Sequence, residues 1–148
     1  MNKTTDELNN ELKEADDIRR FIAKNEDELI TKKISAFLNE IIDRKNLKKS
    51  QIIEAANLHK SYGYELFSGK KEMPSRDVML RLAIAMGLDL DETQKLLKYS
   101  ELPPLYARNS RDSVIIYAIN NKKNVMNCNL LLEELGHKSL AENNDKAK

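Results

Sequence analysis

The strongest hydrophobic pattern in the chain lies between residues 29 and 44. Apolar side chains recur there at spacings of three and four, without an intervening Gly or Pro: Leu29, Ile30, Ile34, Phe37, Leu38, Ile41 and Ile42. This is the period of an α-helix that buries one face. The pattern therefore predicts one continuous helix over 29–44, packed against a core.

A thinner stripe of the same period runs from Thr5 to Lys24. Its members are Leu8, Leu12, Ala15, Ile18 and Ile22, which suffice to line one face of a helix. The stripe predicts an N-terminal amphipathic helical extension over residues 1–28. The pattern leaves three possibilities open. The helix can pack on the rest of the protein, it can contact a second copy or a partner, or the segment can be disordered.

Residues 47–69 are expected to form two short helices joined by a tight turn. The helices cover 50–56 and 59–67, and Gly69 stands where a left-handed residue ends a helix. The second helix would carry apolar side chains on one face and these polar ones on the other: Lys60, Ser61, Tyr64 and Glu65. This is the layout of a helix-turn-helix.

The last third of the chain repeats the segment before it. When residue 110 is laid on residue 75, the two segments align without a gap at an offset of 35 residues. The matches include Ser75-Arg76-Asp77 with Ser110-Arg111-Asp112, Ala83-Ile84 with Ala118-Ile119, Leu96-Leu97 with Leu131-Leu132, and Leu105 with Leu140. Each copy has the pattern of a helix, a tight turn and a helix. The sequence thus predicts a duplicated helical hairpin with a polar tail over 106–148, packed on the first copy through Ile115, Ala118, Ile119, Leu131 and Leu132.

Composition favours an all-α protein. The 148 residues include no Trp, only 4 Gly and 3 Pro, and 33% charged residues, a balance typical of helical rather than sheet proteins. The chain has no apolar run long enough to span a membrane and no secretory signal, so we expect a cytoplasmic protein without a membrane partner.

Candidate chemistry is sparse. A single cysteine, Cys128, cannot form an internal disulfide, and the distant His59 and His137 do not have the spacing of zinc ligands. No Gly-rich phosphate loop and no nucleophile with plausible catalytic partners is apparent. We therefore expect no metal, no cofactor and no enzymatic activity.

Charge is unevenly distributed along the chain, although the net charge is only +1. Residues 1–30 have a net charge of −4, whereas residues 44–76 have a net charge of +5. A basic segment of this kind can neutralise the phosphates of a nucleic acid. The basic segment includes the two predicted helices of residues 47–69.

From Ile34 to Leu97, about 64 residues, the chain resembles the phage repressor and Cro family, also called the xenobiotic-response-element family. The matching positions are Leu47, Ile52, Ile53, Leu58, Leu66, Gly69, Pro74, Leu82-Ala83 and Gly87-Leu88, together with the ending Glu65-Leu66-Phe67-Ser68-Gly69. The resemblance implies a five-helix repressor-like domain over 29–105, whose third helix enters the DNA major groove. Gly63 departs from the pattern, because an aliphatic anchor is usual there. An interior Gly weakens a helix by about 1 kcal/mol relative to Ala, which leaves three outcomes open: a short helix, a bent helix, or the close approach of a neighbour.

The resemblance also implies a function and the residues that perform it. DNA base contacts are expected from one group of side chains: Lys49, Lys60, Ser61, Tyr64 and Glu65. Phosphate contacts are expected from the flanking Lys48, Lys70 and Lys71. The sequence thus suggests a sequence-specific regulator of transcription that binds double-stranded DNA as a homodimer. The alternative is a helical adaptor that uses the same fold as a scaffold and docks a partner protein through its N-terminal helix or C-terminal hairpin.

Overall fold

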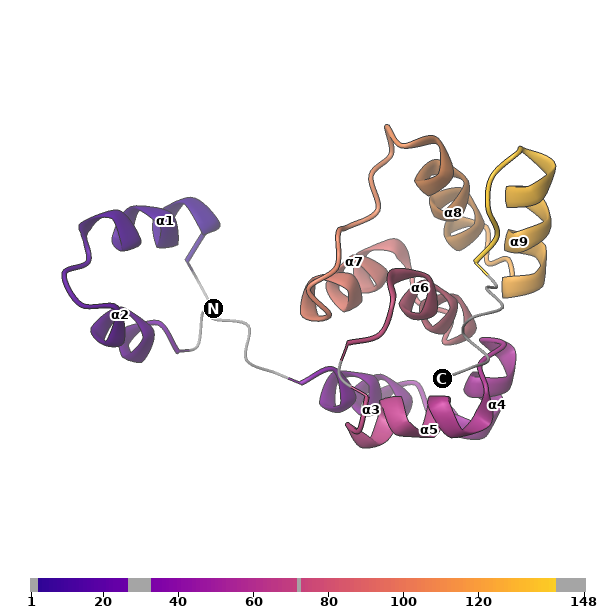
Figure 1. Ribbon diagram of the computed structural model, residues 1–148, viewed down its shortest axis with the longest axis horizontal. Coiled ribbons are helices and arrows are strands. Elements are labelled where there is room, and N and C mark those ends of the chain that lie inside the picture. The colour runs from indigo at the N-terminus through magenta and orange to yellow at the C-terminus, as the bar shows by residue number, and fades with distance from the viewer. Residues whose placement is uncertain (1–2, 27–32, 72, 141–148) are drawn as a thin grey trace. The chain divides into compact units, whose positions relative to one another are not determined.

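The computed structural model describes residues 3–26, 33–71 and 73–140, which form nine helices and no strand (Figure 1). The protein is therefore all-helical over its described part, as predicted. The chain divides into two compact units, Met1–Thr31 and Lys32–Lys148.

The N-terminal unit contains two helices, so the prediction of one helix from Thr5 to Lys24 is wrong. Helix α1 spans Thr5–Glu14 and α2 spans Ile18–Lys24. Between them Ala15 is extended, and the Asp17 carboxylate accepts a hydrogen bond from the backbone amide of Arg19 at 3.0 Å. Asp17 is an N-cap, which starts a new helix where the apolar period alone predicted continuation.

The N-terminal unit buries little apolar surface. Phe21 is its one buried apolar side chain among the described residues, and the buried Asn25 amide donates to the Glu11 carboxylate at 2.8 Å. Three large apolar side chains of the unit remain exposed: Leu12, Ile18 and Ile22. Two helices this short do not enclose a core of their own.

The second unit begins with α3, Ile34–Arg44. The predicted helix over 29–44 is therefore shorter than expected, because Lys33 is extended (φ −72°, ψ 148°) and caps α3; residues 29–32 lie outside the described residues. The buried face of α3 follows the predicted stripe with Ile34, Leu38, Ile41 and Ile42.

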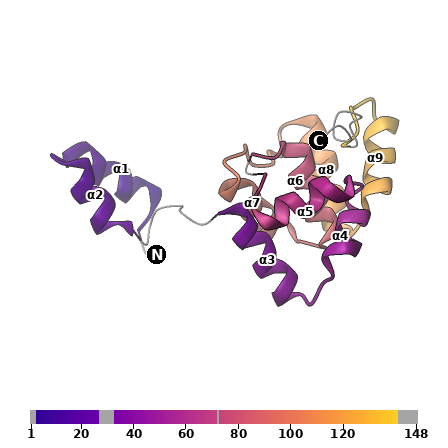
Figure 2. The ribbon, with the colours of Figure 1, turned by 60° about the horizontal axis from the view of Figure 1, so that its bottom comes forward.

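Four further helices join α3 around one hydrophobic core: α4 (Lys49–Ala55), α5 (Lys60–Ser68), α6 (Arg76–Ala85) and α7 (Leu90–Tyr99) (Figures 1 and 2). Among these five helices, the same turn connects consecutive helices in three places. A residue with positive φ follows the first helix: Asn46 after α3, Asn57 after α4 and Gly87 after α6. The amide of the next residue then bonds back to the last turn of that helix, as Leu58 does to Ile53 at 3.1 Å. This Schellman geometry satisfies the helix ends and keeps the connections short.

The last two helices reproduce the preceding pair. Helix α8 spans Ser110–Asn120 and α9 spans Val125–Glu134. The N-caps Asp89 and Asn124, which start α7 and α9, differ by the 35 residues of the sequence repeat, and so do the positive-φ residues Gly87 and Lys122. The two hairpins therefore share the positions of their turns and N-caps.

Burial of the second hairpin also follows the prediction, with one exception. Ile115, Ala118, Ile119 and Leu132 are buried in the core that α3 to α7 share, whereas Leu131 is only half-buried. Helix α9 packs on α6, and α8 packs on α7. The second copy therefore extends the core of the first.

Two reciprocal ion pairs join the hairpins. Arg76 donates to both Asp112 oxygens at 2.9 and 2.8 Å, and Arg111 donates to both Asp77 oxygens at 3.1 Å. Each arginine thus binds the aspartate of the other copy, which is the reciprocity that a two-fold axis produces. We call these four residues the arginine–aspartate clasp.

One member of the clasp has a perturbed acidity. Burial disfavours the charged form of Asp112, but the hydrogen bonds from Arg76 and from the Tyr106 backbone amide, at 3.0 Å, favour it more strongly. The pKa of the Asp112 carboxyl is therefore lowered from its ordinary value. The native clasp holds this carboxylate in its charged form.

Candidate nucleic-acid interface

The turn between α4 and α5 is tied to the core of the second unit. Asn57 takes the left-handed conformation (φ 58°), and its carbonyl accepts a hydrogen bond from the Arg81 guanidinium at 2.9 Å. Arg81 is only 1% exposed although it is charged. Sequence reasoning did not identify Arg81 as a structural residue. The signal that could have revealed it is the presence of a basic residue within the apolar run of α6. The hydrogen bond fixes the start of α5 relative to α6.

Helices α4 and α5 approach each other closely at Gly63. A Cβ placed on Gly63 would lie 2.5 Å from the Cγ2 atom of Ile53, closer than side chains pack. Of the three consequences that the sequence left open for Gly63, the structure shows the close approach of a neighbour. The missing side chain lets Ile53 of α4 fill the space beside α5.

The exposed face of α5 carries the side chains that were predicted to contact DNA bases. Lys60, Ser61 and Tyr64 are exposed, Tyr64 by 39%, and Glu65 is half-buried. The opposite face is buried through Tyr62, Gly63, Leu66 and Phe67. The predicted division of this helix into a polar and a buried face is confirmed.

Two of the predicted residues line one hollow on the surface of the α4–α5 pair. Lys60 and Tyr64 border a cavity of about 290 Å³, together with Ser50 and Glu54 of α4. Sequence reasoning did not include Ser50 or Glu54 in the site. They lie one turn apart on α4, but no family position pointed to them.

The segment after α5 contains two residues that the sequence predicts to contact phosphates, and both lie at the surface. Gly69 has φ 92°, and the Glu65 carbonyl accepts hydrogen bonds from the amides of Gly69, Lys70 and Lys71 at 3.0 to 3.3 Å. The Asn39 amide of α3 donates to the Phe67 carbonyl at 2.8 Å, which anchors the end of α5. Lys70 and Lys71 are thereby held with exposed side chains.

The start of α4 places the other two predicted lysines. Lys48 is the exposed N-cap, and its side chain makes no capping hydrogen bond. Lys49 is half-buried, with its ammonium 5.7 Å from the centroid of the Phe67 ring. This cation–π contact brings Lys49 beside the C-terminal turn of α5.

The basic residues of 44–76 fall into two groups. Three arginine and lysine side chains neutralise acids of the fold: Arg44 and Lys45 pair with Glu92 at 2.9 and 3.5 Å, and Arg76 pairs with Asp112. The others form no ion pair within the described residues, and all belong to the predicted site: Lys48, Lys49, Lys60, Lys70 and Lys71. The positive charge available to an anionic partner is thus concentrated around α4 and α5.

A further lysine adjoins this group. Lys33 and Lys71 line one cavity of about 220 Å³, together with Ser35, Gly69 and Tyr99 among others. Sequence reasoning missed Lys33 because it was placed inside a predicted helix. As the extended cap of α3, it adds to the charge beside Lys71.

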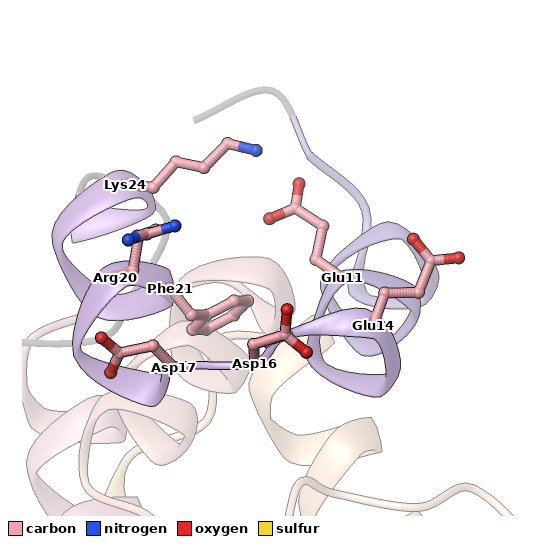
Figure 3. A pocket seen from close by; sticks show the side chains of 8 residues that line it. Glu11, Glu14, Asp16, Asp17, Arg20, Phe21 and Lys24 are labelled. Carbon is pink, nitrogen blue, oxygen red and sulfur yellow. The ribbon is translucent and has the colours of Figure 1, made fainter.

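The N-terminal unit has a hollow of its own between α1 and α2, of about 290 Å³. In Figure 3, Glu11 of α1 and Lys24 of α2 extend toward each other across it, and the Phe21 ring projects from α2 between the helices. Hydrogen bonds from Lys3 and Asn25 lower the pKa of Glu11. The Glu11 carboxylate therefore already has hydrogen-bond partners within the N-terminal unit.

The described part of the chain offers no metal cluster, since it contains no group of three His, Cys, Asp or Glu side chains placed to share an ion. Burial raises the pKa of Cys128 to about 11, although Arg111 acts in the opposite direction. The buried thiol is therefore protonated near neutral pH.

Comparison of the chain with known proteins adds no relative. No family model, no curated protein and no solved structure matches it. Among the described residues, none of the helices combines the length and apolar character needed to cross a membrane. Evidence for function therefore comes from the residues and geometry of the α4–α5 pair.

Proposed function

We propose that the protein is a sequence-specific regulator of transcription that binds double-stranded DNA in the cytoplasm of its cell. The observation that carries the proposal is the set of lysines around the exposed polar face of α5 that form no ion pair with any residue the structure describes. Clustered lysines of this kind bind phosphates and release counterions. The polar face between them suits hydrogen bonding to base edges.

The order and packing of α3 to α7 support the same proposal. In a repressor-like domain, five helices enclose one core and the third enters the major groove. Here α5 is the third of the five, and the close approach at Gly63 and the Arg81 hydrogen bond set its position against α4 and α6. In the proposed complex, Lys60, Ser61 and Tyr64 face the bases.

A homodimer belongs to this proposal, because domains of this type bind two half-sites of an operator. The N-terminal unit offers a contact surface, since Leu12, Ile18 and Ile22 are exposed on two helices that enclose little core. Ile18 and Ile22 are four residues apart and so share one face of α2, and exposed apolar side chains on one face are typical of protein contacts. Light scattering of the full chain tests the dimer.

A salt titration of DNA binding tests the proposed function. The protein is titrated against labelled genomic fragments, and affinity is measured by fluorescence anisotropy over a range of ionic strength. If Lys48, Lys70 and Lys71 each neutralise a phosphate, the logarithm of affinity falls with the logarithm of salt with a slope of about −3 per protomer. No binding to any fragment at low salt would refute the proposal.

A matched pair of variants locates the contact. Lys70→Ala/Lys71→Ala is expected to weaken binding to all sequences alike and to reduce the slope by about 2. Lys95→Ala/Lys98→Ala removes the same charge from exposed positions on α7, and it is expected to leave both quantities unchanged. Equal effects of the two variants would mean that DNA binding depends on net charge alone.

A helical adaptor remains the second candidate, because one observation favours it. Met126 and Leu130 are exposed on α9, outside the proposed DNA contacts. A protein that used its fold only as a scaffold would bind a partner there without binding DNA. The salt titration separates the two candidates.

A further inference from the structure

The two hairpin copies allow their solvent-facing surfaces to be compared position by position. The exposed stripe of α7 consists of Asp91, Lys95 and Lys98, and the equivalent stripe of α9, 35 residues later, consists of Met126, Leu130 and Glu133. All of these positions are exposed. Since α7 carries charged side chains there, the hairpin fold itself does not require apolar ones. The apolar pair on α9 calls for another explanation.

Met126 and Leu130 border a groove between α4 and α9. They stand four residues apart, so they share one face of α9, and they are 65% and 55% exposed. The groove has a volume of about 450 Å³, and Ala55 of α4 and Val125 of α9 also line it. In Figure 1, α9 lies above α4 on the same side of the second unit, and residues of both helices line the groove. Adjacent apolar side chains at a groove are typical of an interaction site.

The groove is acidic. Among the described residues, its lining includes the carboxylates of Glu54 and Glu133 and no basic side chain. Glu133 and Glu134 also end α9, where the helix dipole disfavours negative charge, whereas α7 has the basic Lys98 in its last turn. A cation placed beside α9 would therefore interact favourably with both the carboxylates and the helix end.

We propose that this groove binds a basic amphipathic helix of a partner protein. Two apolar side chains of that helix, one turn apart, contact Met126 and Leu130, while its lysine or arginine side chains lie beside Glu54 and Glu133. The apolar side chains of the partner helix thus meet the apolar side chains of α9, and its positive charges meet the acidic edge of the groove.

Other occupants fit the groove less well. A second copy placed on it by a two-fold axis would bring like carboxylates together, which disfavours that contact. The last residues of the chain, 141–148, contain no apolar side chain larger than Ala, so they lack anchors for Met126 and Leu130. A basic helix from another protein satisfies both the apolar and the charge requirement.

The groove adjoins the proposed DNA contacts, because Glu54 also lines the hollow beside Lys60 and Tyr64. None of its lining residues is among the side chains predicted to touch bases or phosphates. Asn57, in the turn before α5, does line it, so a bound partner would touch the connection that positions α5. The groove proposal therefore goes beyond DNA binding and does not depend on it.

Labelled helical peptides of about 18 residues, long enough to form a helix, test the proposal against the full chain. Both peptides have two leucines one turn apart, flanked by lysines in one and by glutamates in the other. The basic peptide is expected to bind, and the acidic one to bind at least about tenfold more weakly. No binding of the basic peptide, or equal binding of the two, would overturn the proposal.

Variants copied from α7 separate the apolar and electrostatic parts. Met126→Asp/Leu130→Lys keeps the net charge and takes its residues from equivalent positions of the first copy, so the hairpin is expected to remain folded. It should weaken basic-peptide binding at least about tenfold. Glu133→Lys should weaken the basic peptide and strengthen the acidic one. Lys95→Ala on α7 is the control and should change neither.

Two further readouts complete the experiment. Circular dichroism melts check that each variant is folded, and an unchanged peptide affinity in folded Met126→Asp/Leu130→Lys would contradict the groove. If that variant instead converted a wild-type dimer into a monomer, the occupant would be a second copy and the proposal would be wrong. Lys70→Ala/Lys71→Ala should retain peptide binding, so loss of DNA binding and loss of partner binding are distinguishable.

Discussion

Replacing Gly63 with alanine sets helix propensity against packing at the contact between α4 and α5. In an unconstrained helix interior, Gly→Ala stabilises by about 1 kcal/mol. Here the new Cβ would lie 2.5, 2.7 and 2.9 Å from three side-chain carbons of Ile53. Overpacking of a core in this way costs about 1–3 kcal/mol. We therefore expect Gly63→Ala to lower the free energy of unfolding by up to about 2 kcal/mol.

Removing the Ile53 side chain should reverse the sign of this effect. Ile53→Ala alone costs about 2–5 kcal/mol, because it leaves a cavity beside α5. In that background the added Cβ meets no clash and partly fills the space, so Gly63→Ala should stabilise by about 1 kcal/mol. The resulting coupling between the two sites is about 1–3 kcal/mol.

Urea unfolding of the wild type, both single variants and the double variant, followed by far-UV circular dichroism, measures the cycle. Ser61→Ala, on the exposed face of α5, is the control and should change stability by a few tenths of a kcal/mol in either background. If Gly63→Ala stabilised the wild type and the Ile53→Ala variant equally, the close approach of α4 and α5 would not govern this position.

Three further predictions concern other parts of the molecule. Lys60→Ala should cost about 1–3 kcal/mol of DNA affinity at a specific site and little on random DNA, measured by anisotropy; equal losses would make Lys60 a positioning contact. The lowered pKa of Asp112 implies stability that is present above about pH 4 and lost as the pH falls through the folded-state pKa. The stability difference between wild type and Asp112→Asn, from urea midpoints, should therefore shrink below about pH 4, and a constant difference would contradict the ionic role of the clasp. Truncation after Tyr106 exposes the core face under α8 and α9, where each buried Leu or Ile contributes roughly 1.5–3 kcal/mol, so the product should melt early or aggregate. A truncated chain that stayed folded but lost its dimer or a partner would make the second hairpin an interaction surface.

Periodicity and repetition in the sequence predicted those parts of the structure that depend on local contacts. The 35-residue offset predicted the second hairpin, because equal turns and equal core positions leave equal residue types in the sequence. Gly69 and Asn57 likewise marked turns, since few residue types tolerate a left-handed backbone.

Helix boundaries in the first part of the chain were not predictable from the apolar period. The stripe from Leu8 to Ile22 continues in phase across Asp17, so it gives no sign that Asp17 caps a new helix. Lys33 similarly lies within a continuous apolar pattern although its backbone is extended. A helix cap depends on whether a side chain or the helical backbone forms the hydrogen bonds of a single turn. An apolar pattern that extends over several turns does not report this local competition.

The sequence predicted which residues lie on the exposed face of the candidate site. It did not predict the contacts that hold this face in position. Polar residues on one side of α5 followed from helical spacing alone. The hydrogen bond of Arg81 to Asn57, and the grouping of Lys33 with Lys71, join residues far apart in sequence. Such contacts depend on how the helices pack, which a single sequence does not reveal without the fold.

The arginine–aspartate clasp has a consequence for assembly. Because each hairpin binds the other through reciprocal partners, the second hairpin of one chain can satisfy the first hairpin of another chain with the same four side chains. The fold thus meets the requirement for domain swapping, in which identical elements are exchanged between protomers. Exchanged dimers are expected to form when concentrated protein is partly unfolded and refolded. They would contain the native clasp twice, once between each pair of hairpins drawn from different chains.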